Sequence, residues 1–384
     1  MKKPKIKPKN INFASGPSSK RAGWTPNALK GALVGRYHKS DDCIYKVREV
    51  LQKSRDILGI PKNYKLAIVP ASDTGAVELA LWNLLGKLPV EVLVFGSFSK
   101  HWAIDIAKEL KIKNCKILEA GFGKLPNLQA VKSDTKDIVF TLNATTAGTC
   151  VPANMNWLKS KRKGLTICDG SSGVFAYNIN WKKLDVITWS WQKVMGGEAG
   201  FGMLALSPKA VKRLESFSPK NRPIPKVFRI KKNGKLDEEI FDGYSINTLS
   251  MLAVEDAIDS LNWIKKVGGL KGSVKRVEQN YKVLETFVNG SEIFEFLCPQ
   301  KQYRSKTSVC LKIVDKDFAK LSKLAQKKFL GAMIKLLEKE KVAYDISSYR
   351  YAPLGLRIWC GPTINLTDLK ALTSWLEWAF IQLK

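Results

Sequence analysis

The chain has 384 residues, 45% of them hydrophobic, and its 64 Lys and Arg against 34 Asp and Glu give a formal net charge of +30. A chain of this length is expected to bury a large core in about two domains. No apolar run approaches the roughly 20 residues that a membrane span needs. The basic N-terminus is not followed by the apolar stretch of a secretory signal. The basic residues are spread over the whole length instead of forming a stripe or tail, so we expect no nucleic-acid partner and no membrane partner, but a positive field that attracts small anions.

Hydrophobic periodicity predicts that strands and helices alternate over the first half of the chain. Residues 41–58 place Ile44, Val47, Leu51 and Leu58 on one face of a helix. Further helices are predicted at 76–85 and 102–110, and strands at 66–70, 90–95, 116–119, 137–142, 165–168 and 186–189. Such alternation is typical of an α/β fold, in which helices cover both faces of a mostly parallel sheet.

A different pattern begins near residue 244. Long helices at 251–261 and 271–289 precede short strands at 308–313 and 356–360, with a helix at 329–340 between the two strands. This arrangement predicts a smaller α+β domain. We therefore predict a large domain over residues 16–255 and a small C-terminal domain over 256–384, to which residues 1–15 also belong.

Lys193 and Asp169 stand at the ends of two predicted strands. Lys193 follows the strand at 186–189 and precedes a glycine pair, and Asp169 follows the strand at 165–168. Ligands of α/β sheets bind beyond the carboxyl ends of the strands. An amine and a carboxylate placed there suit pyridoxal 5'-phosphate, which needs a Schiff-base lysine and an acid facing its pyridinium nitrogen. The alternative is a surface lysine and an aspartate in a turn.

Other strand-end turns carry groups that suit the same site. Ser72-Asp73-Thr74 precedes a helix, where hydroxyls and backbone N–H groups hold phosphates, although an ordinary helix N-cap has the same sequence. Trp102 has the ring to stack on an aromatic cofactor, or it belongs to the core. Thr145 lies in the turn 143–148 after another strand. Complementary groups at several strand ends favour one shared site.

Five short motifs resemble those of the phosphoserine aminotransferases, which belong to class V of the fold-type I pyridoxal-phosphate enzymes. The motifs are Asn12-Phe13-x-x-Gly16-Pro17, Asn143-x-Thr145-x-x-Gly148, Asp169-x-Ser171-Ser172, Gln192-Lys193 and Asn247-Thr248. Their order and spacing are similar to those of the family, and the resemblance covers nearly the whole chain. It implies a seven-stranded sheet in the large domain and a divergent member of the bacterial-type branch.

The resemblance implies a role for each residue. Lys193 would bind the cofactor as a Schiff base and move the proton between the substrate Cα and the cofactor C4′, and Asp169 would keep the pyridine nitrogen protonated. Trp102 would stack on the ring, and Thr145 would bind its O3′ oxygen. The residues that would hold the cofactor phosphate are Ser72, Asp73, Thr74, Gln192, Asn247 and Thr248. Because the last two would come from a second subunit, the resemblance implies a homodimer with shared active sites.

The implied reaction transfers the amino group of glutamate to 3-phosphohydroxypyruvate, in serine biosynthesis, by a ping-pong mechanism. The phosphorylated four-carbon analogue of pyridoxine biosynthesis is a second candidate substrate. Arg357 would bind the substrate carboxylate, and His38, Lys39 and Arg350 would bind its phosphate. The family has arginine where this chain has Lys39, and its bacterial branch has arginine where this chain has Thr74, so phosphate recognition is expected to differ.

Two alternatives stay open at this point. One is another class V enzyme, an alanine–glyoxylate aminotransferase or a cysteine desulfurase, because desulfurases carry histidine where the ring stacks and His101 is adjacent to Trp102. Cys310 and Cys360 lie in strand-like runs instead of an exposed glycine-rich loop, which argues against a desulfurase. The other alternative is a basic nucleic-acid-binding protein with an α/β core.

Cysteine usage gives an expectation about the compartment. The chain has seven cysteines and no CxxC pair, which argues against a disulfide framework and against a zinc site. We therefore expect no bound metal and a cytoplasmic location.

Overall fold

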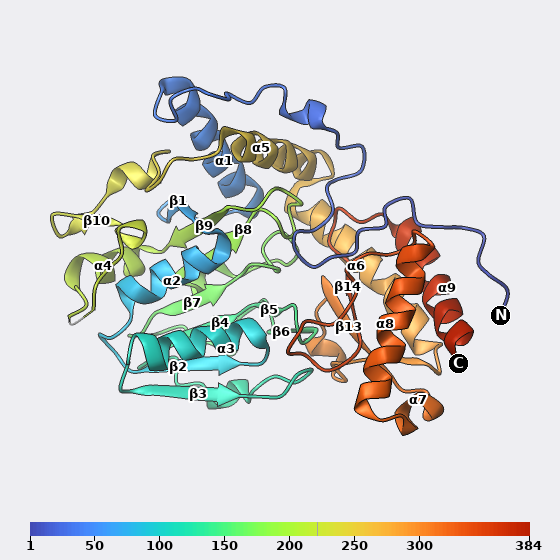
Figure 1. Cartoon of the computed structure of the whole chain (residues 1–384). Helices are drawn as coiled ribbons and strands as arrows, with labels where there is room; N and C mark the ends of the chain where they lie inside the picture. Colours follow the sequence, from blue (N-terminus) through green and yellow to red (C-terminus); the bar gives the residue numbers. More distant parts are fainter. Residues whose placement is uncertain (221) are drawn as a thin grey trace.

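A seven-stranded sheet forms the centre of the molecule in the computed structural model, which describes residues 1–220 and 222–384 (Figure 1). The strands lie in the order β1 (Lys65–Pro70), β9 (Phe201–Leu206), β8 (Val186–Ser190), β7 (Thr166–Asp169), β4 (Asp137–Thr141), β2 (Val90–Val94) and β3 (Cys115–Glu119). β9 runs antiparallel to both of its neighbours, and the other adjacent pairs are parallel. The predicted α/β fold with a mostly parallel seven-stranded sheet is confirmed.

Both faces of this sheet are buried. Every residue of β2, β4, β7, β8 and β9 is buried, which explains why these strands are near-continuous apolar runs in the sequence. On one face lie α2 (Ser72–Leu84), α3 (Ser97–Ile104) and α4 (Pro208–Ser216). On the other face, α1 (Asp41–Leu58) packs against β1 and α5 (Met251–Lys266). Two short hairpins complete this part, β5 (Asn143–Ala144) with β6 (Thr149–Cys150) and β10 (Lys231–Lys232) with β11 (Lys235–Leu236).

Two helices begin earlier than apolar spacing predicts. α2 begins at Ser72 instead of residue 76, and α3 begins at Ser97 instead of residue 102 and ends in a π-helical turn at Asp105–Glu109. In both cases the first turn lies at a strand end and is rich in polar residues, so the apolar pattern begins only in the second turn. The apolar pattern also does not predict β9, whose run contains Gly202 and follows a glycine-rich turn.

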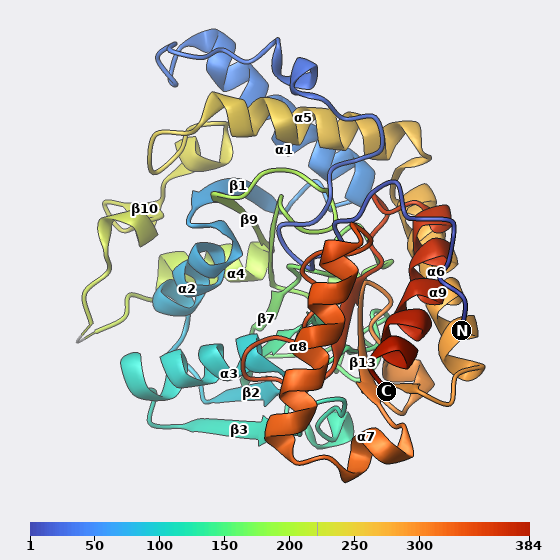
Figure 2. The ribbon, with the colours of Figure 1, turned by 45° about the vertical axis from the view of Figure 1, so that its right-hand side comes forward.

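The C-terminal part is built around a three-stranded antiparallel sheet, in the order β12 (Phe294–Phe296), β13 (Ser308–Ile313) and β14 (Leu356–Trp359). The remaining helices are α6 (Gly269–Asn289), α7 (Lys316–Lys320), α8 (Lys323–Lys339) and α9 (Leu366–Leu383). α9 packs against both α6 and α8, as Figure 2 shows. This is the smaller α+β unit expected from the sequence.

The first residues of the chain lie on the C-terminal part (Figure 2). The indole Nε1 of Trp375 donates a hydrogen bond of 2.8 Å to the carbonyl oxygen of Ile6, and the backbone N–H of Trp359 donates one of 3.0 Å to that of Phe13. The predicted boundary after residue 255 falls inside α5. The division into two domains stays a prediction.

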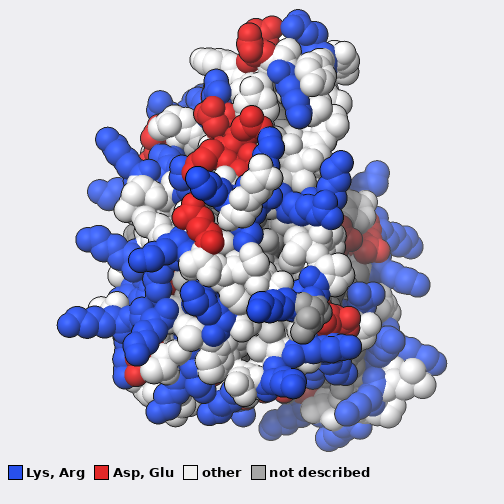
Figure 3. Space-filling model, turned by 90° about the vertical axis from the view of Figure 1, so that its left-hand side faces the viewer, with Lys and Arg blue, Asp and Glu red and all other residues white. Residues whose placement is uncertain are grey.

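Positive side chains are spread over the surface. On the face that includes α4 and the β10–β11 hairpin, Lys and Arg cover much of the area, whereas Asp and Glu gather mainly toward the α1 end (Figure 3). Within residues 1–220 and 222–384, no helix is long and apolar enough to cross a membrane. All seven cysteines are free thiols, and six of them are buried.

Candidate active site

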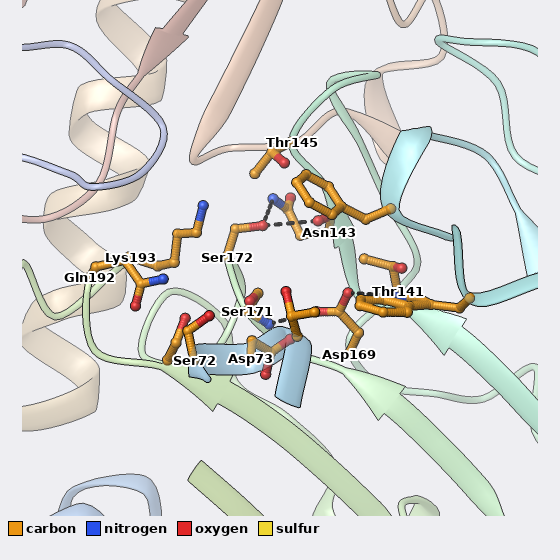
Figure 4. A pocket seen from close by; sticks show the side chains of 14 residues that line it. Ser72, Asp73, Thr141, Asn143, Thr145, Asp169, Ser171, Ser172, Gln192 and Lys193 are labelled. Carbon is orange, nitrogen blue, oxygen red and sulfur yellow. Dashed lines mark hydrogen bonds between the residues drawn. The ribbon is translucent and has the colours of Figure 1, made fainter. Parts of the chain in front are cut away.

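A pocket lies at the edge of the sheet where β4, β7 and β8 end (Figure 4). Eight residues that the sequence assigns to the cofactor line it together: Ser72, Asp73, Thr74, Trp102, Thr145, Asp169, Gln192 and Lys193. They come from the first turn of α2, from α3, from the β5–β6 hairpin, from the end of β7 and from the turn after β8. The fold therefore gathers strand-end residues from distant parts of the sequence at one point.

Lys193 reaches the pocket from the turn after β8, and its amine faces the N-terminal segment. Nζ donates a hydrogen bond of 3.0 Å to the carbonyl oxygen of Ser15. Gly16 has a φ of +144°, and a Cβ on this residue would lie 2.1 Å from Nζ, so only glycine leaves room for the amine. Burial, followed by the positive charge of Arg357, lowers the pKa of Lys193 to about 8. The neutral, nucleophilic form of the amine is therefore far more populated near neutral pH than that of an ordinary lysine.

Asp169 is the last residue of β7, and both of its carboxylate oxygens are held. Oδ1 accepts a hydrogen bond of 3.0 Å from the backbone N–H of Ser171, and Oδ2 accepts one of 2.9 Å from the indole Nε1 of Trp102. The side chain is buried. These contacts fix the carboxylate in one orientation inside the pocket, which suits an acid that faces a ring nitrogen.

Asp73, in the first turn of α2, is also buried and lies beside Asp169. Its Oδ1 atom has no hydrogen-bond partner. Burial and, second, the negative charge of Asp169 raise the pKa of Asp73 well above its usual range. Two buried carboxyl groups therefore face the same pocket.

The first turn of α2 is suited to hold a phosphate. α2 presents its N-terminus to the pocket, where free backbone N–H groups and the helix dipole attract anions. Gly202 in β9 permits this approach, because a Cβ there would lie 2.2 Å from the carbonyl oxygen of Ser72. Ser72 and Thr74 add hydroxyl groups at the same turn.

Several buried polar atoms around the pocket lack a hydrogen-bond partner among the residues that the structure describes. They include Thr141 Oγ1, Ser190 Oγ and Gln192 Oε1. Buried polar groups are otherwise almost always paired, so this set indicates a ligand that carries donors and acceptors of its own. A helix N-terminus, a fixed carboxylate and the Trp102 ring together fit a phosphorylated nitrogen heterocycle such as pyridoxal phosphate.

Two of the predicted substrate residues, Arg357 and Arg350, belong to the C-terminal part of the chain and do not line the pocket itself. Arg357, in β14, lies close enough to Lys193 for its charge to act on the amine, and its buried Nε has no hydrogen-bond partner. Its guanidinium carbon is 5.8 Å from the centre of the Tyr349 ring, and that ring is 5.7 Å from the ring of Phe98 in the pocket. Arg350 is exposed and lies over Tyr351, 5.0 Å from its ring centre.

Besides Arg350 and Arg357, four further predicted residues do not line the pocket of their own chain: His38, Lys39, Asn247 and Thr248. His38 and Lys39 precede α1, where His38 packs 5.4 Å from the Tyr37 ring. Asn247 and Thr248 precede α5, which packs beside α1 (Figure 1). Neither segment lines the pocket around Lys193 within the chain. Their roles stay predictions.

Six residues in the pocket were not among the predicted site residues: Phe98, Thr141, Asn143, Ser171, Ser172 and Ser190. Thr141 and Ser190 are the last residues of β4 and β8. The rule that polar residues at strand ends face the ligand identifies them once the strand limits are known. Phe98 carries no such signal, because an aromatic residue in a helix is usually part of the core.

The sequence also matches known families and proteins. The family model described as aminotransferase class V matches residues 30–334. Curated proteins named phosphoserine aminotransferase, from Methanosarcina mazei and Methanosarcina barkeri, are each 51% identical to this chain over 98% of its length and 99% of theirs.

Solved structures with the same fold include phosphoserine aminotransferases. One from Cytophaga hutchinsonii superposes with a TM-score of 0.82 at 22% identity, over 96% of this chain and 98% of that one. A second, from Trichomonas vaginalis with pyridoxal phosphate bound, has a TM-score of 0.77 at 17% identity, over 96% and 100%. These identities establish a shared fold only.

Proposed function

This chain belongs to the class V aminotransferase family, and from that premise we propose that it is a phosphoserine aminotransferase with pyridoxal 5'-phosphate as its cofactor. It transfers the amino group of glutamate to 3-phosphohydroxypyruvate. The observation that carries the proposal is 51% identity, over nearly the full length, to curated phosphoserine aminotransferases. The pocket supports it, because it places a lysine, a fixed carboxylate and a helix N-terminus around one space.

Different residues of the pocket are suited to different parts of the cofactor. Bound pyridoxal phosphate supplies an aldehyde that reacts with amines and a ring that accepts electrons from the substrate α-carbon. The first turn of α2 and Gln192 would hold the phosphate, Asp169 would face the ring nitrogen, and Trp102 would stack on the ring. Thr145 would bind the ring hydroxyl, and Lys193 would hold the aldehyde end.

Lys193 also moves the proton on which transamination depends. With a pKa lowered to about 8, its amine is suited to act as a base near neutral pH. It accepts the proton from the substrate α-carbon and returns a proton on the cofactor side. Asp169 keeps a proton on the ring nitrogen, so that negative charge from the α-carbon is stabilised throughout.

Four basic residues would recognise the substrates: Arg357, Arg350, His38 and Lys39. A guanidinium binds a carboxylate through two parallel hydrogen bonds, and the free Nε of Arg357 is available for one of them. Arg350, His38 and Lys39 bind the phosphate of 3-phosphohydroxypyruvate. The lysine at position 39 keeps the positive charge but not the bidentate geometry of an arginine.

We further propose a homodimer in the cytoplasm with two shared active sites. Asn247, Thr248, His38 and Lys39 do not line the pocket of their own chain, and a second copy related by a two-fold axis would bring them to its site. Complementation tests this sharing. Lys193→Ala and Asn247→Ala homodimers lose activity, and mixed dimers regain one intact site. Mixed dimers without any gain would contradict the sharing.

A cysteine desulfurase is less well supported by the pocket. Trp102 lines it, whereas His101 packs 6.1 Å from Phe98 and is not a lining residue. Burial raises the pKa of both Cys310 and Cys360, so neither thiol is set up as a nucleophile.

Spectroscopy and kinetics test the proposed function together. The purified protein is expected to be yellow, to lose its visible band on borohydride reduction, and to carry the label on Lys193. Lys193→Ala is expected to fold but to be inactive. Glutamate-dependent amination of 3-phosphohydroxypyruvate should be far faster than that of hydroxypyruvate. Equal rates with both acceptors would contradict the phosphate-site assignment.

A further inference from the structure

Asp73 has surroundings that a role in holding phosphate does not explain. Its side chain is 6% exposed, and its Oδ1 atom has no hydrogen-bond partner. The carboxyl group lies beside the carboxyl of Asp169 on the wall of the pocket (Figure 4). The hydroxyls of Ser171 and Thr188 lie close to it. A carboxyl group thus occupies a turn that is expected to bind a dianion.

The charges around this position disfavour an ionised Asp73. The titratable groups that face it are Asp169 and Cys168 from β7 and Lys193 from the turn after β8. Lys193 has its pKa lowered to about 8, so its positive charge is only partial near that pH. A negative Asp73 would repel Asp169 and the cofactor phosphate at the same time. Burial and Asp169 accordingly raise the pKa of Asp73 well above its usual range.

We propose that Asp73 is a positioning residue for the reaction: its carboxyl stays neutral, donates a hydrogen bond to the carboxylate of Asp169, and holds that carboxylate against the cofactor ring. The proton is shared between two carboxyl groups, as in other pairs that cannot both ionise. Asp169 already accepts hydrogen bonds from Ser171 and Trp102, and a carboxylate has further lone pairs for a third donor.

This inference rests on the proposed function for its effect on the cofactor, but not for the carboxyl pair itself. It changes the assignment of Asp73 from the phosphate to the ring. The backbone N–H groups of the turn remain available to the phosphate. A substitution of the side chain therefore acts through Asp169, and its effect does not depend on whether the ligand carries a phosphate.

Comparing two ligands separates these roles. Pyridoxal phosphate and pyridoxal, which lacks the phosphate, are titrated by absorbance into the cofactor-free protein. Asp73→Ala is expected to weaken both by a similar factor of about ten or more, because a hydrogen bond to a charged group is lost. Thr74→Ala, from the same turn, should weaken pyridoxal phosphate alone. A loss with Asp73→Ala that is confined to pyridoxal phosphate would overturn the proposal.

An asparagine at position 73 tests whether Asp73 acts on Asp169 in its neutral form. Asp73→Asn keeps a neutral donor of nearly the same size, and it is expected to bind pyridoxal phosphate within about three-fold of the unmodified chain. A loss as large as that of Asp73→Ala would contradict a neutral carboxyl donor.

Stability of the cofactor-free protein tests the pair without any ligand. A carboxyl whose pKa is raised by folding destabilises the folded state progressively as pH rises above its unfolded value of 3.8. Asp73→Asn removes this loss, so its melting temperature should exceed that of the unmodified chain by a margin that grows from pH 4 upward. Asp41→Asn, an exposed aspartate in the first turn of α1, is the matched control and should show no such growth.

The binding measurement and the stability measurement test the two proposals independently of each other. A chain that binds no pyridoxal phosphate would refute the proposed function, whereas the pH dependence of Asp73→Asn would still report on the carboxyl pair. If the difference in melting temperature between Asp73→Asn and the unmodified chain did not change with pH, the proposed carboxyl pair would be contradicted, even in an active enzyme.

Discussion

The indole Nε1 of Trp102 donates a hydrogen bond of 2.9 Å to Oδ2 of Asp169. This bond joins the residue proposed to cover the cofactor ring to the residue proposed to meet its nitrogen. Because both side chains are buried, the bond fixes the plane of the indole and the direction of the carboxylate together. Stacking and protonation at the ring are thus coupled through one donor.

Trp102→Phe separates the ring of Trp102 from its N–H group. Phenylalanine keeps a stacking surface but leaves Asp169 without one of its donors, so we expect affinity for pyridoxal phosphate to fall about ten-fold. The visible band of the bound cofactor should also titrate at a different pH. Absorbance titration measures both. Unchanged affinity and an unchanged titration would show that the N–H group has no role beyond packing.

Lys193→Met should stabilise the cofactor-free protein at pH 7. Folding lowers the pKa of this lysine from 10.5 to about 8, so the unfolded chain binds more protons between these values. Stability of the unmodified chain therefore rises with pH over this window, and below pH 8 the cost of the buried charge is fully present. The advantage of Lys193→Met should shrink from pH 8 to pH 10.5 in denaturant unfolding. Lys39→Met, at an exposed site, is the control.

Arg357→Lys should raise KM for glutamate and for 3-phosphohydroxypyruvate alike, because both substrates present a carboxylate. Loss of a bidentate, charge-assisted contact corresponds to an increase of about ten- to a hundred-fold. Arg350→Lys should raise KM for 3-phosphohydroxypyruvate alone. Steady-state kinetics in which the two substrates are varied separately distinguishes the two arginines. An effect of Arg357→Lys on one substrate only would refute its assignment.

Gly16→Ala should block the catalytic amine. The new Cβ would lie 2.1 Å from Lys193 Nζ, at a φ of +144°, so the amine must leave its place beside Ser15. We expect at least a ten-fold slower reaction of the cofactor-free protein with pyridoxal phosphate, measured by stopped-flow absorbance. Gly23→Ala is the control, since Gly23 also has a positive φ of +73° but has no atom within 4 Å of its Cβ position. Equal rates for both variants would contradict the steric argument.

The sequence predicts the sheet and much of the pocket for one physical reason. Strands buried on both faces appear as apolar runs, and the polar residue that follows each run, such as Asp169, marks the edge where ligands bind. The antiparallel strand β9 escapes this rule, because Gly202 interrupts its run to admit the first turn of α2.

Contacts between distant segments account for what the sequence does not predict. The hydrogen bond from Lys193 to Ser15 and the pairing of Asp73 with Asp169 depend on how the turns approach one another in space. Such distances cannot be predicted from the spacing of residues along the chain. His38 and Asn247 show the same limit, since neither lines the pocket of its own chain and the roles proposed for them require a second copy.

The seating of the N-terminal segment on the C-terminal part has a consequence for the order in which the enzyme matures. Ser15 accepts the hydrogen bond from Lys193, and the residues just before it are held by Trp359 and Trp375. A chain still emerging from the ribosome has its lysine and its sheet long before these two tryptophans. The amine therefore acquires its final surroundings only after the segment that carries Trp359 and Trp375 has been synthesised, and nascent chains that still lack this segment are not expected to capture the cofactor.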